Sequence, residues 1–308
     1  MGLSPSHPSH PYPSRKAFRV KKPQRTLLAA ALLTVSALAV TPSPAFAAGQ
    51  DRPQYVALGD SYAAAPLVRP ADPANPRCVR SLGNYPNVAA DVLGAELTDV
   101  TCSGATARDF TRSAHAGTPP QYDALSADTD LVSITIGAND AELFRLPNTC
   151  VNLLPEPLGT SCEATNTGSG TDRYAAAIEA WAPTFDAVLT AVRARAPHAR
   201  VVVVGYGTYF RPGGCFPAQP YWGRDADYIQ ARIDQLGTVL REAAARHGAL
   251  YTDTAGISAG HDACAPQEDR YIQSALSLRD GFPLHPTAAG SRAFGEAVAA
   301  TLTDDGER

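Results

Sequence analysis

The chain has 308 residues, and its 26 basic and 30 acidic side chains are distributed unevenly along it. The first 48 residues hold six of the basic side chains and none of the acidic ones, which leaves 20 basic against 30 acidic residues, a net charge of −10, in the remainder. Because nucleic-acid binding depends on neutralising backbone phosphates, so acidic a chain is a poor candidate for it, and we expect no nucleic-acid partner.

Residues 1–48 have the pattern of a secretory signal peptide. The basic residues precede an apolar run of 14 residues at positions 27–40. This run is short for a membrane span, which needs about 20 residues. The small-x-small tripeptide at residues 45–47 then provides a cleavage pattern. An uncleaved anchor is the alternative. We expect cleavage near Ala47 or Ala48 and a secreted mature chain, residues 49–308, that forms one domain.

Residues 49–308 alternate between strand-like and helix-like patterns. The four valines at residues 201–204 are typical of a buried parallel strand. Pro286 predicts the start of the last helix, because proline favours the first helical position. Such alternation favours a parallel sheet with helices on both faces. In chain order, strands are predicted at residues 55–58, 99–101, 130–136, 200–205 and 249–253, and helices at residues 86–94, 172–195, 226–247 and 286–302.

Two long segments interrupt this alternation, and an aromatic loop follows one of the strands. Residues 69–83 and 149–171 are rich in Pro, Gly, Asn and Ser, and both contain cysteines. Loops of this length are usually functional or tied by disulfides. Residues 209–224 are rich in aromatic side chains. These side chains either line an acyl or aryl pocket or cover an edge of the sheet.

All six cysteines lie within residues 49–308. An even number of cysteines in an exported chain predicts disulfide bonds. Six cysteines allow many pairings, of which the sequential one closes the shortest loops. A metal site is the alternative, but the chain lacks cysteine and histidine pairs at ligand spacing, so we expect no metal. The expected disulfides are Cys78–Cys102, Cys150–Cys162 and Cys215–Cys264.

The tetrapeptide Gly-Asp-Ser-Tyr at residues 59–62 directly follows the first predicted strand. Its serine, Ser61, therefore lies at the carboxyl edge of the sheet, where open α/β folds place their chemistry. A serine hydroxyl is a weak nucleophile that needs a base within hydrogen-bond reach and donors for the developing oxyanion. Among the histidines, His285 is the candidate base, because Pro286 fixes the backbone beside it.

Four short motifs in a consistent order make the chain resemble the SGNH (GDSL) hydrolase superfamily, specifically its secreted actinobacterial esterase/lipase branch. They are Gly-Asp-Ser-Tyr at residues 59–62, Ser-Gly at residues 103–104, Gly-Ala-Asn-Asp at residues 137–140 and His-Pro at residues 285–286. The resemblance covers essentially all of residues 49–308. It implies an SGNH hydrolase domain there, with an α/β fold of three α/β/α layers and a flavodoxin-like parallel sheet of about five strands.

The resemblance also implies the roles of four residues. Ser61 would be the nucleophile, and His285 would be the general base and then the general acid. The backbone N–H groups of Ser61 and Gly104 would form the oxyanion hole together with the side-chain amide of Asn139. These residue types suit the role, because a glycine lacks a Cβ and an asparagine amide donates without a charge.

The chain departs from the family pattern in front of the histidine. The common pattern is Asp-x-x-His, but the residue three positions before His285 is Phe282, and the nearest preceding aspartate is Asp280. We expect a main-chain carbonyl, that of Phe282, to orient the imidazole in a Ser–His dyad. Alternatively, Asp280 bends back to reach the ring. A carbonyl fixes the tautomer but stabilises the imidazolium less than a carboxylate does.

The sequence therefore predicts a secreted serine esterase or lipase that hydrolyses carboxylic esters, acylglycerols or similar lipid esters, through an acyl-enzyme on Ser61. A phospholipase A/B or a carbohydrate deacetylase on the same site is one alternative. A non-catalytic secreted binding protein is an alternative of another class. We expect no cofactor, a small-molecule or lipid ester as substrate, at most transient contact with a lipid interface, and a monomer.

Overall fold

The computed structural model describes residues 52–115 and 117–304, and the predicted signal peptide lies outside these residues. The described part is built around a five-stranded parallel sheet with the strand order β2-β1-β3-β4-β5. This is the flavodoxin-like order, and the expected fold class is confirmed. The strands are β1 (Gln54–Gly59), β2 (Glu96–Asp99), β3 (Leu131–Thr135), β4 (Arg200–Val204) and β5 (Leu250–Thr252).

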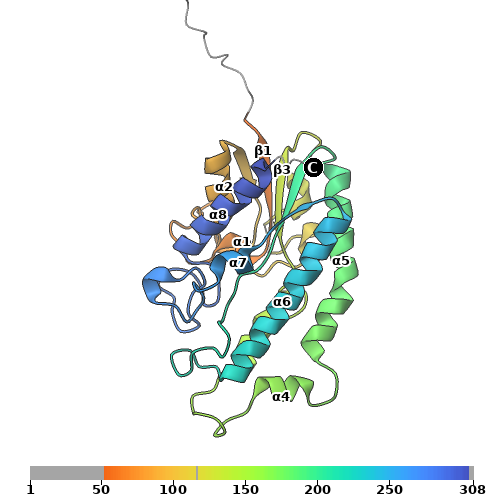
Figure 1. Ribbon diagram of the computed structural model, residues 1–308. Coiled ribbons are helices and arrows are strands. Elements are labelled where there is room, and N and C mark those ends of the chain that lie inside the picture. The colour runs from red at the N-terminus through yellow and green to blue at the C-terminus, as the bar shows by residue number, and fades with distance from the viewer. Residues whose placement is uncertain (1–51, 116, 305–308) are drawn as a thin grey trace, which may run out of the picture. The chain divides into compact units, whose positions relative to one another are not determined.

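Helices cover both faces of the sheet, as the alternating pattern predicts. The helices are α1 (Ser61–Ala64), α2 (Tyr85–Leu93), α3 (Leu146–Thr149), α4 (Cys162–Thr167), α5 (Arg173–Arg195), α6 (Gly223–Arg246), α7 (Thr254–Ser258) and α8 (Ala288–Thr303). The pair α2 and α8 packs on one face, and the long pair α5 and α6 packs on the other (Figure 1). The central strand β3 is buried at every position, so the sheet forms the middle of the core.

The strand order brings two of the sequence motifs together. β1 pairs with β2 on one side and with β3 on the other, where Gly59 lies opposite Thr135. The carboxyl ends of β1 and β3 therefore form the topological switch point, outside which open α/β sheets bind their ligands. The Gly-Asp-Ser-Tyr motif follows β1 and the Gly-Ala-Asn-Asp motif follows β3. Both motifs thus reach the switch point.

Among the predicted element boundaries that differ from the structure, two differ for clear local reasons. β2 ends at Asp99, where the prediction has it begin, because the Asp99 carboxylate accepts the backbone N–H of Thr101 at 2.9 Å and turns the chain. α8 begins later than predicted, since the side chain of Thr287 accepts the Gly290 N–H at 3.0 Å and caps the helix. In both cases a polar side chain outweighs the pattern of apolar residues.

The three disulfides pair in sequence order, as expected: Cys78–Cys102, Cys150–Cys162 and Cys215–Cys264. None of these cysteines lies in a strand. Each disulfide instead joins segments of the connections that follow the carboxyl ends of the strands. The disulfides therefore stabilise the loops at the edge of the sheet that carries the motifs, rather than the sheet itself.

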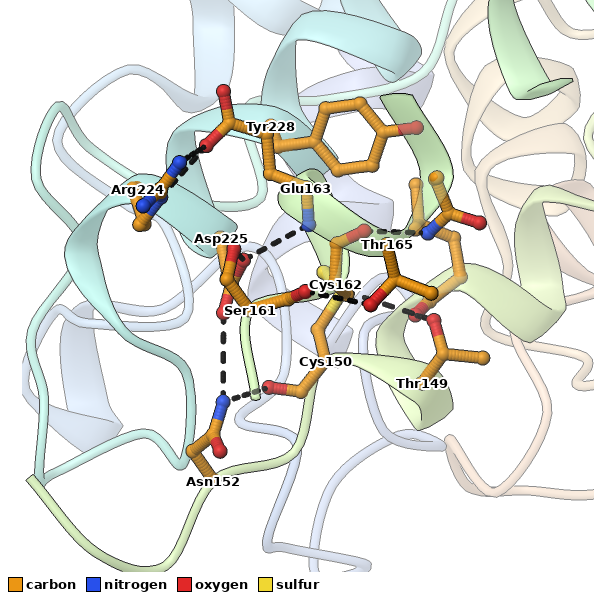
Figure 2. Close-up of a disulfide and its surroundings, with 12 residues drawn as sticks. Thr149, Cys150, Asn152, Ser161, Cys162, Glu163, Thr165, Arg224, Asp225 and Tyr228 are labelled. Carbon is orange, nitrogen blue, oxygen red and sulfur yellow. Dashed lines mark hydrogen bonds and ion pairs between the residues drawn. A yellow bond between two sulfur atoms is a disulfide. The ribbon is translucent and has the colours of Figure 1, made fainter. Parts of the chain in front are cut away.

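The connection after β3 is anchored to α6 as well as by its own disulfide. Figure 2 shows Asp225 of α6 beside the Cys150–Cys162 disulfide. Its buried carboxylate accepts the Ser161 hydroxyl at 2.7 Å and the Glu163 N–H at 3.1 Å. One aspartate thus fixes the start of α4, and with it a segment that the sequence pattern predicts only as a long loop.

Candidate active site

Ser61 occupies the first position of α1, directly after β1. The carboxylate of Asp60 caps this helix by accepting the Tyr62 N–H at 2.9 Å. Gly59 is required at the end of the strand, because a Cβ built there would lie 2.7 Å from the carbonyl oxygen of Thr135. The backbone N–H of a residue at the first helical position has no partner within the helix. The turn therefore presents the Ser61 hydroxyl and its N–H at the switch point.

His285 approaches Ser61 from the loop before α8. Its Nε2 lies 2.8 Å from Ser61 Oγ, and its Nδ1 lies 2.9 Å from the carbonyl oxygen of Pro283. A carbonyl oxygen can only accept, so Nδ1 carries the proton and Nε2 is free to accept the serine hydroxyl. The half-buried imidazole is thus held in the tautomer that a general base needs.

Neither residue expected to orient His285 does so. The carbonyl of Phe282 accepts the backbone N–H of His285 at 3.0 Å, whereas the ring nitrogen bonds to Pro283. The carboxylate of Asp280 accepts the N–H of Ala288 at 3.2 Å and faces the start of α8. The expectation of a main-chain carbonyl is right in kind but wrong by one residue.

The cause of this difference is a turn at Leu284. This residue has a left-handed φ of 57°, which is uncommon outside glycine and asparagine. The turn closes with the hydrogen bond from the His285 N–H to the Phe282 carbonyl, and it places the ring against the next carbonyl along the chain, that of Pro283. The side chain of Phe282 also contacts His285: its ring lies edge-on to the imidazole, with 5.3 Å between the two centroids.

Gly104 and Asn139 lie on two loops that are tied to each other. The Nδ2 of Asn139 donates to the carbonyl of Ala105 at 2.9 Å, and the carboxylate of Asp140 accepts the Ala107 N–H at 3.0 Å. An amide group has two donor hydrogens, so Asn139 keeps one for a ligand. Gly104 is exposed and has a left-handed φ of 83°.

A bulky side chain explains the glycine of the Gly-Ala-Asn-Asp motif. A Cβ built at Gly137 would lie 2.5 Å from the indole ring of Trp181, which packs beneath this turn from α5. Gly137 therefore lets the chain leave β3 across the face of a tryptophan, which brings Asn139 back toward the carboxyl end of β1.

Two further residues support the site and were not found by sequence reasoning. The buried amide of Gln121 accepts the Gly59 N–H at 2.8 Å and donates to the Gly59 carbonyl at 2.9 Å. The hydroxyl of Tyr206, which lies shortly after β4, donates to Asp60 at 2.6 Å. Gln121 begins a short 3-10 helix, Gln121–Ala124, whose sequence has no distinctive pattern. Tyr206 carried a usable signal, since it is a polar side chain directly beyond a strand at the carboxyl edge.

Burial changes the electrostatics of two groups at the site. Desolvation lowers the pKa of His285 below its usual 6.5, although the bond to the Pro283 carbonyl partly opposes this shift. Desolvation also raises the pKa of Asp60 to about 7, against the effect of its hydrogen bonds from Tyr206 and Tyr62. The imidazole is therefore neutral at neutral pH, which suits a base.

A cavity of about 300 Å³ opens beside Ser61 and His285. For the aromatic segment 209–224, the structure favours the alternative of a pocket lining. Tyr209 and Tyr221 line the cavity, whereas Phe210 packs edge-on against Tyr221 from within the core. The other apolar and aromatic side chains of the lining include Leu143, Phe144, Pro147, Ile233 and Phe282.

In residues 52–115 and 117–304, no cluster of three or more histidine, cysteine or acidic side chains has the arrangement of a metal site. The hydrogen bonds of His285 support the chemistry of a serine with a neutral histidine beside it. Such a pair can transfer an acyl group, provided that donors meet the developing oxyanion. Ser61 and Asn139 both line the cavity, and the amide of Asn139 is bonded to Ala105, the residue that follows Gly104.

The comparisons with known proteins agree with this geometry. Residues 57–293 match the model of the GDSL-like lipase/acylhydrolase family. Lipase 2 from Streptomyces coelicolor is 42% identical over 270 residues, which cover 84% of this chain and 90% of that protein.

Two solved structures are similar as well. The phospholipase A1 from Streptomyces albidoflavus NA297 has a TM-score of 0.68, and the extracellular lipase from Streptomyces rimosus has a TM-score of 0.69. Each is 30% identical and covers 81% of this chain and 99% of its own. With its fold, its ordered motifs and these relatives, the chain belongs to the GDSL-like lipase/acylhydrolase family.

Proposed function

We propose that Ser61 is the nucleophile and His285 the general base with which this chain hydrolyses carboxylic esters. The observation that carries the proposal is the 2.8 Å hydrogen bond from Ser61 Oγ to an imidazole whose other nitrogen is fixed by a carbonyl. Ser61 Oγ attacks the ester carbonyl while Nε2 takes its proton. Nε2 then returns the proton to the leaving alcohol, and an acyl-enzyme remains. Water activated by His285 releases the acid.

The oxyanion of each tetrahedral intermediate is stabilised by three donors. They are the backbone N–H groups of Ser61 and Gly104 and the second amide hydrogen of Asn139. The bond from Asn139 to Ala105 supports this role, because it orients the amide before the substrate arrives. Donors that are already oriented need no rearrangement as the charge develops.

The substrate that fits best is an ester with an extended acyl chain, as in lipids. The apolar lining of the cavity supports this choice. Two of the lining side chains, Phe144 and Phe282, are also 53% and 46% exposed, so apolar surface continues from the cavity to the outside. Such surface favours transient contact with a lipid interface. The similarity to a phospholipase A1 makes phosphatidylcholine the second substrate to test.

The proposed location of the mature protein is outside the cell, after secretion. Three disulfides favour an oxidising compartment, and one similar structure is that of an extracellular lipase. Across residues 52–115 and 117–304, none of the helices has both the length and the apolar character that crossing a bilayer requires.

The proposal is tested by labelling and by chain-length profiling on the purified protein. A serine-directed phosphonate should add its mass to the peptide that contains Ser61, and hydrolysis of nitrophenyl esters should be fastest for acyl chains of medium length. Label on another serine would refute the assignment of Ser61. Fatty acid released from phosphatidylcholine would indicate a phospholipase, and a preference for acetylated sugars would indicate a deacetylase.

Replacing Asn139 tests the oxyanion hole. We expect Asn139→Ala to lower kcat by about 10²–10³-fold with little change in KM, because the lost donor acts on the transition state. Steady-state kinetics on one nitrophenyl ester measures both constants. The matched control is Asn166→Ala, whose amide donates within α4 to the Cys162 carbonyl and should leave kcat unchanged. Equal rates for both variants would exclude Asn139 from the oxyanion hole.

Replacing Asp280 tests the dyad. In a Ser-His-Asp triad, exchanging the aspartate for asparagine lowers kcat by about 10⁴-fold. Because the Asp280 carboxylate bonds to the Ala288 N–H instead of the imidazole, we expect Asp280→Asn to keep most of the activity. A loss on the scale of a triad would mean that Asp280 reaches His285 during turnover.

The pH profile reports the protonation of His285. The neutral imidazole is the active form, and burial lowers the pKa of His285. The step that abolishes kcat/KM should therefore lie below pH 6.5. A complete loss of activity above pH 7 would contradict a desolvated base.

A further inference from the structure

One buried side chain joins the two loops of the proposed site. The hydroxyl of Tyr206 donates to Asp60 Oδ2 at 2.6 Å and accepts the backbone N–H of Ala138 at 3.2 Å. Asp60 caps the turn that begins with Ser61, and Ala138 directly precedes Asn139. Tyr206 is only 3% exposed, and its ring packs edge-on against that of Tyr62.

We propose that Tyr206 is a positioning residue that sets the distance between the Ser61 hydroxyl and the Asn139 amide, through its hydrogen bonds to Asp60 and Ala138. The inference rests on the roles proposed above for Ser61 and Asn139. A phenol in a packed core is rigid, so its oxygen is a fixed point between the two loops. Displacing a nucleophile by about 1 Å can lower the reaction rate by about 10²-fold, so the position of the Tyr206 oxygen affects the rate.

The hydrogen-bond pattern favours the ionised form of Asp60. One of its oxygens accepts the Tyr62 N–H and the other accepts the Tyr206 hydroxyl. If Asp60 were protonated, the Tyr206 oxygen would receive two donors and its own proton would lose its acceptor. Protonation of Asp60 should therefore loosen the link between the loops without removing the base.

Several titratable groups face Asp60. The Tyr206 hydroxyl and the backbone N–H of Tyr62 donate to Asp60 and favour its ionised form, and the charge of Asp140 opposes it. Tyr85 from α2 and Tyr209 from the connection after β4 also interact with its charge. With Tyr206 replaced by phenylalanine, the carboxylate keeps its burial but loses a donor, so the pKa of Asp60 rises above about 7.

The test is Tyr206→Phe, with Tyr55→Phe as the matched control. Tyr55 is buried in β1 and donates to Ser133 at 2.7 Å, so its variant also loses one buried hydrogen bond but no link between the loops. We expect Tyr206→Phe to lower kcat by about 10- to 100-fold at nearly constant KM. In its pH profile, the partial step that reports Asp60 should lie at higher pH than in wild type or Tyr55→Phe, in which the pKa of Asp60 is about 7.

A second variant shows whether Tyr206 acts through Asp60. In Asp60→Asn the titrating group is gone, so the partial step should be absent, and adding Tyr206→Phe should lower kcat by less than the product of the two single effects. Asp60→Asn also serves if Tyr206→Phe does not fold. Unchanged kcat in Tyr206→Phe, an unchanged pH profile, or an equal loss in Tyr55→Phe would each overturn the proposal.

Two further variants distinguish an error in the role of Tyr206 from an error in the proposed function. Ser61→Ala and Asn139→Ala are measured on the same substrate. If both are slow while Tyr206→Phe is as fast as wild type, only the positioning role is wrong. If Ser61→Ala is as fast as wild type, the proposed nucleophile is wrong and the positioning role falls with it.

Discussion

Ser61→Ala should abolish ester hydrolysis while leaving the protein folded. Removal of the nucleophile in a serine hydrolase costs about 10⁴-fold or more in kcat, since only binding and the oxyanion hole remain. The substitution deletes a single oxygen, and the cap of α1 is provided by the Asp60 carboxylate instead of Ser61. The helix should therefore persist. Hydrolysis of a nitrophenyl ester and thermal unfolding measure the two properties.

The control for this variant is Ser169→Ala. Ser169 is exposed in the segment between α4 and α5 and does not line the cavity, so its variant should keep full activity. Residual activity of Ser61→Ala that a phosphonate still blocks would point to a second nucleophilic serine and contradict the mechanism.

His285→Gln should be nearly as inactive as Ser61→Ala. Glutamine is close in size but cannot take a proton, so the Ser61 hydroxyl loses its base. Because the two residues act as a unit, the double variant should be no slower than the slower single one. Single-turnover kinetics with a nitrophenyl ester compares all three. The exposed His198, changed to glutamine in the same way, is the control. Fully additive losses would mean that Ser61 and His285 do not act in one step.

The parts of the fold that the sequence predicts are those with strong local signals. The valines at residues 201–204 predict β4, and the ordered motifs predict both the flavodoxin-like sheet and the pair Ser61 and His285. The structure brings these two within hydrogen-bond distance across 224 positions of sequence. Motif order succeeds here because the carboxyl ends of parallel strands meet at one edge.

The parts that could not be predicted depend on single dihedral angles or on distant partners. The carbonyl that orients His285 is chosen by a left-handed leucine at position 284, for which the sequence has no marker. The bonds of Gln121 to Gly59 and of Tyr206 to Asp60 span 62 and 146 positions. Such contacts exist only once the sheet has placed their segments side by side.

The positions of the disulfides determine how the protein can be produced. Since all three tie the connections beyond the strands, a host that keeps thiols reduced could still assemble the sheet and its helices. The loop around Gly104 would then lack the Cys78–Cys102 staple, which lies two residues before it. Protein from a reducing cytosol could thus be soluble and helical and still lack the disulfide that holds the loop around Gly104. Thiol titration of each preparation is the quality control that matters.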